Sequence, residues 1–76
     1  MVISKIYIDA HSSSSGQMIA HNLCEINHII KGQATIFLEG EEHILHEGDT
    51  LFLGAYTKHN IVNQTEEELL LFTLQC

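Results

Sequence analysis

Four of the five glycines in this 76-residue chain are Gly16, Gly32, Gly40 and Gly48, which stand at multiples of eight. The segments between them are rich in Ile, Leu, Phe, Thr and Val, the residues that favour β-strands. Short strands separated by turn residues every eight to twelve positions or so are typical of a β-sandwich or β-barrel. The spacing therefore predicts an all-β fold, and a chain of this length has room for only one domain.

The expected strands lie at 2–9, 29–30, 34–38, 43–45 and 50–53. Glu39 and Gly40 predict a tight hairpin turn, and residues 47–49 predict a second turn, so we expect these strands to follow one another as a meander. The serine-rich segment 11–16 predicts a polar loop, because serine and glycine favour turns over pairing with a neighbouring strand.

The C-terminal run from Leu69 to Leu74 is almost wholly apolar and is consistent with two structures. A continuous apolar run of this length fits a buried strand. The alternative is a helix, because Thr65 followed by Glu68 has the spacing of a capping box ahead of the apolar run. We expect the strand.

The charge of the chain excludes several classes of partner. Three Lys, no Arg and ten acidic residues give a formal net charge of −7, which repels nucleic acid and anionic membrane surfaces. No apolar stretch approaches the roughly 20 residues that a membrane helix needs, and we identify no signal peptide. Cys24 and Cys76 lack the spacing of a metal-binding pair, so we expect free thiols and a cytoplasmic location.

Three side chains form a candidate metal site: His21, Glu25 and His59. Two imidazoles and one carboxylate suit a divalent transition metal such as Fe, Mn, Ni, Cu, Zn or Co. Residues four apart on a straight strand lie about 13 Å from each other, so the chain must bend between His21 and Glu25, and Asn22 tolerates such a bend. We expect His59 to approach from a facing strand.

A second argument for a cation concerns Glu25 alone. If its carboxylate points into an apolar barrel, it needs a cation or a proton, because an isolated buried charge is costly. The lysine nearest in sequence to the site, Lys58, precedes His59 and should face the other way on a strand. A metal ion, or a protonated His59, is what remains.

The same residues resemble a known family. His21, Glu25 and Gly32, followed by Gly48, His59 and Asn63, are similar to the two conserved motifs of the cupins, which are small β-barrels of the jelly-roll type. The second motif runs Gly, five residues, Pro-x-Gly, two residues, His, three residues, Asn. The segment from Gly48 to Asn63 keeps this register, with Gly54 in place of the Pro and Tyr56 in place of the second Gly.

The first motif is incomplete, since Ile19 stands where its first His is expected. The resemblance covers residues 16–75. It implies one cupin-type jelly-roll β-barrel domain over residues 1–76, in which residues 1–15 form an N-terminal strand and a Ser-rich loop and residues 16–75 form the barrel. It also implies a metal role for the three matching residues His21, Glu25 and His59.

We expect the site to take a small polar or carboxylate-bearing ligand. Asn27 shares the face of Glu25 by strand alternation, as does Ile29. Asn27 and Ile29, with Phe52 or Leu51 from a neighbouring wall, either line the ligand pocket or belong to the ordinary core. Tyr56 either lines the barrel mouth, where it would contact the ligand, or simply packs there. No residue is assigned a catalytic role.

The function implied by these residues is metal-dependent binding of a small molecule, with enzymatic activity left open. Two alternatives remain: a ligand-sensing barrel without metal, and a purely structural oligomer. Because small scaffolds often gain stability by oligomerisation, we expect a homodimer, formed through residues 2–8 or through an exposed apolar sheet face.

Overall fold

The computed structural model describes residues 1–76 and contains eight strands and no helix. The strands are β1 (Val2–Ile8), β2 (Ser12–Ser13), β3 (Glu25–Lys31), β4 (Ala34–Leu38), β5 (Glu41–Leu45), β6 (Thr50–Leu53), β7 (His59–Asn63) and β8 (Leu69–Gln75). The predicted all-β fold is confirmed. The structure has no helix of the length and hydrophobicity that crossing a membrane requires.

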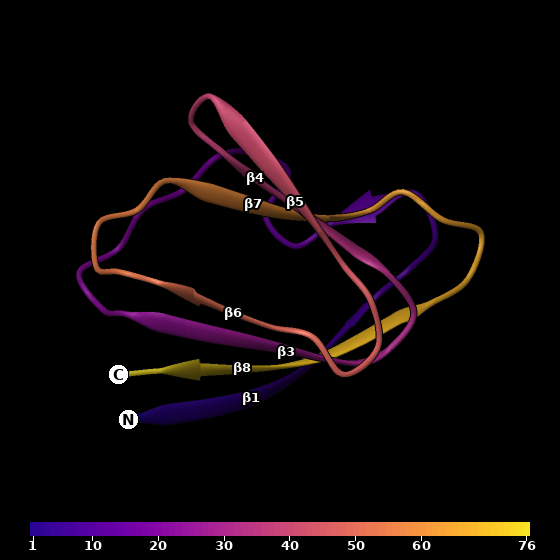
Figure 1. The fold of residues 1–76 in the computed structure, drawn as a ribbon, viewed down its shortest axis with the longest axis horizontal. Coiled ribbons are helices and arrows are strands. Elements are labelled where there is room, and N and C mark those ends of the chain that lie inside the picture. The colour runs from indigo at the N-terminus through magenta and orange to yellow at the C-terminus, as the bar shows by residue number, and fades with distance from the viewer.

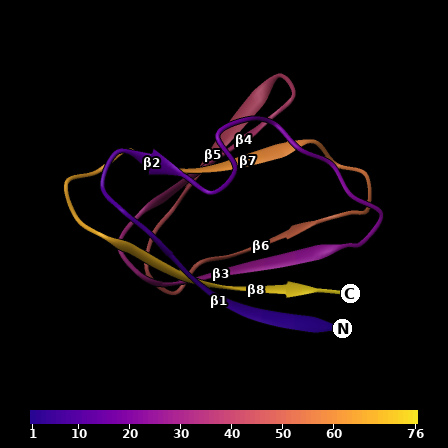
Figure 2. The same ribbon diagram turned by 180° about the vertical axis from the view of Figure 1, so that it is seen from behind.

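The strands form two four-stranded antiparallel sheets that lie face to face (Figure 1). Sheet A has the order β1-β8-β3-β6, and sheet B has the order β2-β7-β4-β5. The view from behind shows the same two layers, with β2 beside β7 (Figure 2). This alternation of early and late strands is the jelly-roll arrangement, so the predicted barrel type is confirmed.

The predicted meander is wrong, because only β4 and β5 are neighbours both in sequence and in a sheet. The predicted hairpin at Glu39 and Gly40 joins them, with a φ of 77° at Gly40. The turn at 47–49 instead leads from sheet B to sheet A, where β6 pairs with β3. Crossing between the layers lets both sheets cover one shared apolar core.

The core lies between the sheets and consists of residues that alternate along the strands. Its buried members are Ile8, Ile29, Ala34, Ile36, Leu45, Leu53, Ile61, Leu69 and Leu71. The C-terminal run is the central strand β8, paired with β1 on one side and β3 on the other, which excludes the helical alternative. Thr65 caps no helix; its backbone N–H and its hydroxyl donate to Oδ1 of Asn63.

Apart from shifts of one or two residues at the end of β1 and the start of β5, two predicted boundaries differ from the structure. The serine-rich loop contains β2, in which Ser12 and Ser13 pair with Asn63 and Val62. Strand β3 extends from Glu25 to Lys31 instead of covering only 29–30. In both cases a neighbouring strand supplies hydrogen-bonding partners that local sequence does not reveal.

Gly32 lies where β3 leads to sheet B and is required there for two reasons. Its φ is 91°, a conformation that side-chain-bearing residues rarely adopt. A Cβ at this position would also lie 3.0 Å from the backbone oxygen of Glu68. The glycine of the first motif therefore maintains the close approach of this turn to the start of β8.

The expectation of free thiols is wrong, because Cys24 and Cys76 form a disulfide. Pairing of β3 with β8 places Glu25 opposite Gln75, so the residue before β3 meets the residue after β8. The Cα atoms of the two cysteines are 5.1 Å apart, and the Cys76 N–H donates to the Cys24 carbonyl. The bond thus ties the C-terminus to the residue that precedes Glu25.

Candidate metal centre

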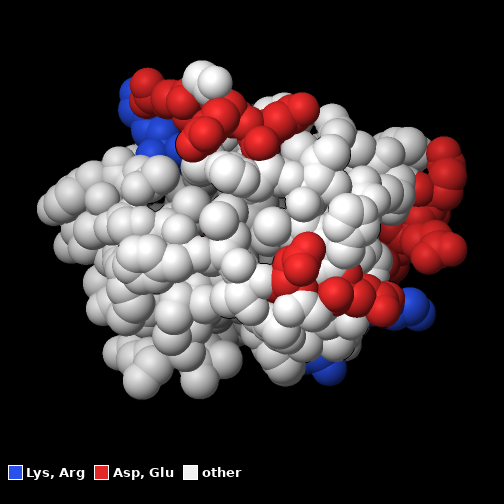
Figure 3. All heavy atoms as spheres, in the orientation of Figure 1, with Lys and Arg blue, Asp and Glu red and all other residues white.

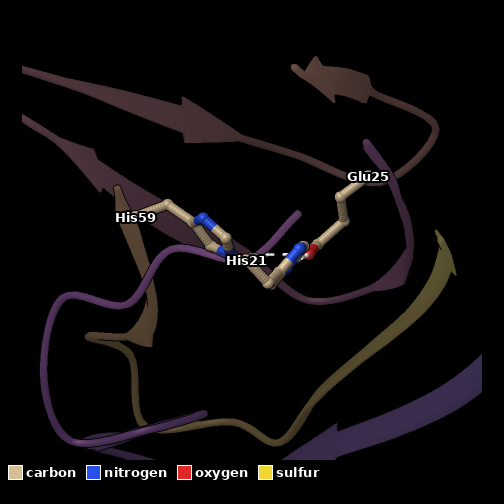
Figure 4. A group of neighbouring side chains, drawn as sticks. All are labelled: His21, Glu25 and His59. Carbon is tan, nitrogen blue, oxygen red and sulfur yellow. Dashed lines mark hydrogen bonds and ion pairs between the residues drawn. The ribbon is translucent and has the colours of Figure 1, made fainter. Parts of the chain in front are cut away.

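Three elements bring His21, Glu25 and His59 together at one end of the barrel (Figure 4). Glu25 is the first residue of β3 in sheet A, and His59 is the first residue of β7 in sheet B. His21 comes from the segment that precedes β3. The predicted bend is present at Asn22 and Leu23, and it brings the His21 ring back over Glu25.

The polar atoms of these three side chains converge on one point. Nε2 of His21 lies 2.8 Å from Oε2 of Glu25, and Nε2 of His59 lies 3.4 Å from the same oxygen. The two imidazole rings are nearly perpendicular, with an interplanar angle of 86° and centroids 5.4 Å apart. One potential ligand atom from each residue lies within 4.8 Å of the other two.

The outer nitrogens of both rings are held by the backbone. Nδ1 of His21 donates to the carbonyl of Leu23 at 3.0 Å, and Nδ1 of His59 donates to the carbonyl of Thr57 at 2.8 Å. A carbonyl can only accept, so each Nδ1 carries the hydrogen, and a neutral ring then presents the Nε2 lone pair inward. Such a second hydrogen bond is the usual way in which a metal-ligating histidine is oriented.

With both rings neutral, the centre therefore collects three acceptors with no donor between them. Glu25 and His59 are each 4% exposed, so water cannot solvate the carboxylate freely. Lys58 faces away, as expected, and pairs with Glu39 at 3.5 Å. Only a bound cation, or a proton on one of the imidazoles, resolves the repulsion among these lone pairs.

The spacing of the three groups fits a divalent metal ion. Two ligand atoms bound at about 2.1 Å are about 3.0 Å apart at a right angle and about 3.4 Å apart at a tetrahedral angle. The observed 3.4 Å between His59 and Glu25 matches the tetrahedral value, and the 2.8 Å between His21 and Glu25 is slightly shorter than the right-angle value. Two imidazoles and one carboxylate also leave coordination positions open for a ligand.

A cavity of about 160 Å³ adjoins the centre and lies between the two sheets. Its wall contains the three candidate ligands together with Ile6, Ser14, Ser15, Ile19, Ile61, Thr73 and Gln75. Sequence reasoning missed Thr73 and Gln75 because the C-terminal segment reads as one apolar run. The available signal is their period of two from Leu69 and Leu71, which places all four on the inner face of β8.

The predicted ligand-binding residues lie in different surroundings. Asn27 is fully buried on the inner face of β3, where its Oδ1 accepts a hydrogen bond from Thr73 and its Nδ2 has no partner. Tyr56 is 73% exposed and is not part of the cavity wall, although its backbone N–H donates to the His21 carbonyl. A ligand role for either residue remains a prediction.

The remaining candidates for the pocket are placed by the alternation of their strands. Ile29 belongs to the buried core, and Leu51 packs against it from β6. Phe52 points to the outside and is 62% exposed. None of the three is part of the cavity wall.

Ile19, which stands where the family motif has its fourth ligand, also faces the cavity. Ile19 forms an isolated bridge with His59, with backbone hydrogen bonds of 2.8 and 2.9 Å in both directions. Directly opposed residues project their side chains to the same face, and Ile19 is part of the cavity wall. His11, from the Ser-rich loop, pairs with Glu66 at 2.8 Å and is not part of the cavity wall.

Comparison with known proteins agrees with the fold and the motifs. The family described as the cupin domain matches residues 6–74. A cupin 2 conserved barrel domain protein from Salinispora arenicola superposes with a TM-score of 0.87 at 25% identity, covering 96% of this chain and 60% of that chain. Among the curated proteins, none matches this sequence.

Two further solved structures are described by an activity. A predicted oxalate decarboxylase from Thermotoga maritima has a TM-score of 0.86 at 20% identity, covering 97% of this chain and 64% of that chain. A sugar phosphate isomerase from Silicibacter pomeroyi has a TM-score of 0.83 at 18% identity, covering 93% and 46%. This chain thus spans less than two thirds of each of these three proteins, and identities this low show a shared fold.

Proposed function

This chain belongs to the cupin family, and from that premise we propose that it binds one divalent transition metal ion through His21, Glu25 and His59. The observation that supports this proposal is the convergence of two Nε2 lone pairs and a buried carboxylate, with both Nδ1 atoms already donating to the backbone. Metal affinity at a site of this kind comes from ligands that are deprotonated and preorganised.

The proposed ligand is a small polar or carboxylate-bearing molecule in the adjoining cavity. When bound, the metal would supply Lewis acidity toward an oxygen of that molecule. The chain itself holds the carboxylate of Glu25 out of water and fixes both imidazoles by their Nδ1 hydrogen bonds. Ile6, Ile19 and Ile61 supply the apolar part of the cavity wall.

The metal content of the protein tests this proposal. Protein purified without chelator should contain about one equivalent of a transition metal by mass spectrometry of the elements. His59→Ala should lose most of that metal, because only two ligands remain. His28→Ala is the matched control, since His28 points out of the same sheet, bonds to Thr50 and should leave the metal content unchanged. Metal that is substoichiometric and insensitive to His59→Ala would reject the site.

A ligand-sensing barrel without metal is the second candidate, and one observation favours it. Ile19 places an apolar side chain where the family motif has its first His, so the site has three ligands instead of four. In that case a proton on an imidazole would balance Glu25. A small acid that raises the melting temperature of the metal-free protein, with no further effect of added metal, would support this candidate.

We propose a homodimer in the cytoplasm, and the disulfide between Cys24 and Cys76 is the observation that stands against this location. The disulfide provides a direct test of the location, because a reducing compartment keeps thiols free. Alkylation at lysis should modify Cys24 and Cys76 if the compartment is reducing. Protection of both cysteines would argue for an oxidising compartment instead.

A further inference from the structure

Four polar residues form a block on the inner face of sheet A beside the candidate metal centre. Pairing of β3 with β8 places Glu25 opposite Gln75 and Asn27 opposite Thr73. The next inward positions on the same two strands are the apolar core residues Ile29 and Leu71. Buried polar groups are costly unless they are hydrogen-bonded, so the burial of these four polar residues needs a physical explanation.

The hydrogen bonding within the block is incomplete. The Thr73 hydroxyl donates to Oδ1 of Asn27 at 2.9 Å, and the two residues are 5% and 0% exposed. Because its proton is used by Asn27, the Thr73 oxygen retains only acceptor capacity. Nδ2 of Asn27 is buried and has no acceptor. Asn63, the other fully buried asparagine, has partners on both of its polar atoms.

The charge of the cavity restricts what can fill it. None of the three lysines is part of its wall, and the chain has no arginine. A phosphate would therefore find no fixed cation besides the metal ion. A ligand with a single carboxylate needs no other cation, because the open positions of a metal held by His21, Glu25 and His59 would bind that carboxylate.

The volume of the cavity restricts the ligand further. A space of about 160 Å³ is small for a ligand site, because pockets for drug-sized molecules measure about 300 to 1,000 Å³. A molecule of about six non-hydrogen atoms, such as a three-carbon hydroxy acid, is of this size. Its carboxylate would lie at the metal, and its hydroxyl would lie beside it along the inner face of sheet A, where Thr73 offers an acceptor.

We propose that Thr73, oriented by Asn27, accepts a hydrogen bond from the hydroxyl group of a short, unphosphorylated hydroxy acid. This inference rests on the proposed function, because the metal holds the carboxylate end of the same molecule. Thr73 then acts as a specificity-determining residue, and Asn27 positions it by fixing the direction of its proton.

The test compares two acids that differ by one hydroxyl group, 3-hydroxypropionate and propionate. Their affinities for the Mn²⁺-loaded protein are measured by calorimetry. The hydroxylated acid should bind about threefold to tenfold more tightly, the usual net value of one hydrogen bond. Thr73→Val, which keeps the shape but removes the hydroxyl, should reduce this ratio to about one while the metal content stays the same.

Two further variants control for folding. Thr35→Val changes the other buried threonine, which lies on β4 and bonds to Gln64, so it should keep the full ratio. Thr73→Ser keeps the hydroxyl and should also keep the ratio, which gives a readout if Thr73→Val fails to fold. A Thr73→Val protein that retains the preference, or a native protein that lacks it, overturns the inference.

Failure of the metal site gives a different result. If the protein holds one equivalent of metal but binds neither acid, the inference about Thr73 is wrong and the proposed metal site stands. If the protein holds no metal, both acids are measured on the metal-free protein. A preference for the hydroxylated acid that is lost in Thr73→Val would then support the role of Thr73, while the metal site would be rejected. If it holds no metal and binds neither acid, both proposals fail.

Discussion

Asn63 shows how a motif residue can serve the fold instead of the site. It is fully buried, and its Nδ2 lies within hydrogen-bonding distance of three backbone carbonyls, those of Ile8, Asp9 and Glu67. Its Oδ1 accepts from Thr65. One side chain thus joins the end of β1 to the turn that leads into β8, and so it fixes the strand that carries Thr73 and Gln75.

Asn63→Ala should therefore destabilise the protein strongly. The substitution leaves buried carbonyls and one N–H without partners, and the expected loss is about 3 kcal/mol of unfolding free energy. Urea denaturation followed by circular dichroism measures it. Asn60→Ala is the matched control on the same strand, because Asn60 makes only a long contact of 3.3 Å to Ser15. Equal losses in the two variants would contradict this role of Asn63.

A substitution of Ile19 tests the site by a gain of metal affinity. Its backbone pairs directly with that of His59, and its side chain is part of the cavity wall. Ile19→His should supply a fourth ligand and raise metal affinity about tenfold or more. Competition with a coloured chelator measures the change.

Met18→His is the control for this gain, because adjacent residues of an extended segment point to opposite faces. It adds an imidazole one position away without aiming it at the site. An equal gain in Met18→His would show that the added histidine binds metal elsewhere.

At this scale the sequence predicted much of the site. Motif spacing identified His21, Glu25 and His59, and strand alternation placed Asn27 and Ile29 on the face of Glu25. The roles of Thr73 and Gln75 could not be predicted, because the register of β8 against β3 decides which residues face Glu25.

Among the elements, β3 and β8 hold the site together. They pair over most of their length, and the disulfide closes their shared end. The sequence predicted most of the strands and one hairpin from local signals. It did not predict which strands share a sheet, because turns such as 47–49 look alike whether they stay within one sheet or cross to the other. The disulfide was missed because only the pairing of β3 with β8 brings Cys24 and Cys76 together.

Loss of the disulfide should lower stability without changing the fold. Cross-links that close loops of this length typically contribute about 2 to 4 kcal/mol by restricting the unfolded chain. Cys76→Ser should therefore lower the urea midpoint. Cys24→Ser should have the same effect, and the double variant should be no worse than either single one, because all three remove the same bond. Losses that add in the double variant would show that the two cysteines act independently.

At the scale of the whole molecule, the charges are segregated. The acidic residues gather over the β4–β5 hairpin and at the right-hand end in the view of Figure 3, while the lower left shows no charged group. The only acidic residue on any strand of sheet A is Glu25, which points inward. The outer face of that sheet carries one apolar row across all four strands, formed by Ile3, Leu74, Ile26 and Phe52. In the neighbouring row the apolar Phe72 lies between Lys5 and His28.

This outer face of sheet A is the surface on which we expect a second copy of the chain to pack. Two molecules with a net charge of −7 repel each other unless they meet where acidic groups are absent, and a contiguous exposed apolar surface marks an interaction site. Phe72 and Phe52, which are 41% and 62% exposed, lie within it.

Light scattering should give a mass twice the 8.6 kDa of one chain. Phe52→Asp should return the protein to a monomer, because a carboxylate buried within the contact would lose its water. Ile44→Asp is the control, since Ile44 is 52% exposed but lies on β5 of sheet B. A native protein that remains monomeric at high micromolar concentration would exclude this interface, as would a dimer that Ile44→Asp dissociates and Phe52→Asp does not. Because the apolar row lies on the opposite face of the strands that carry Glu25 and Thr73, a confirmed dimer would leave both cavities free and would brace each site from behind.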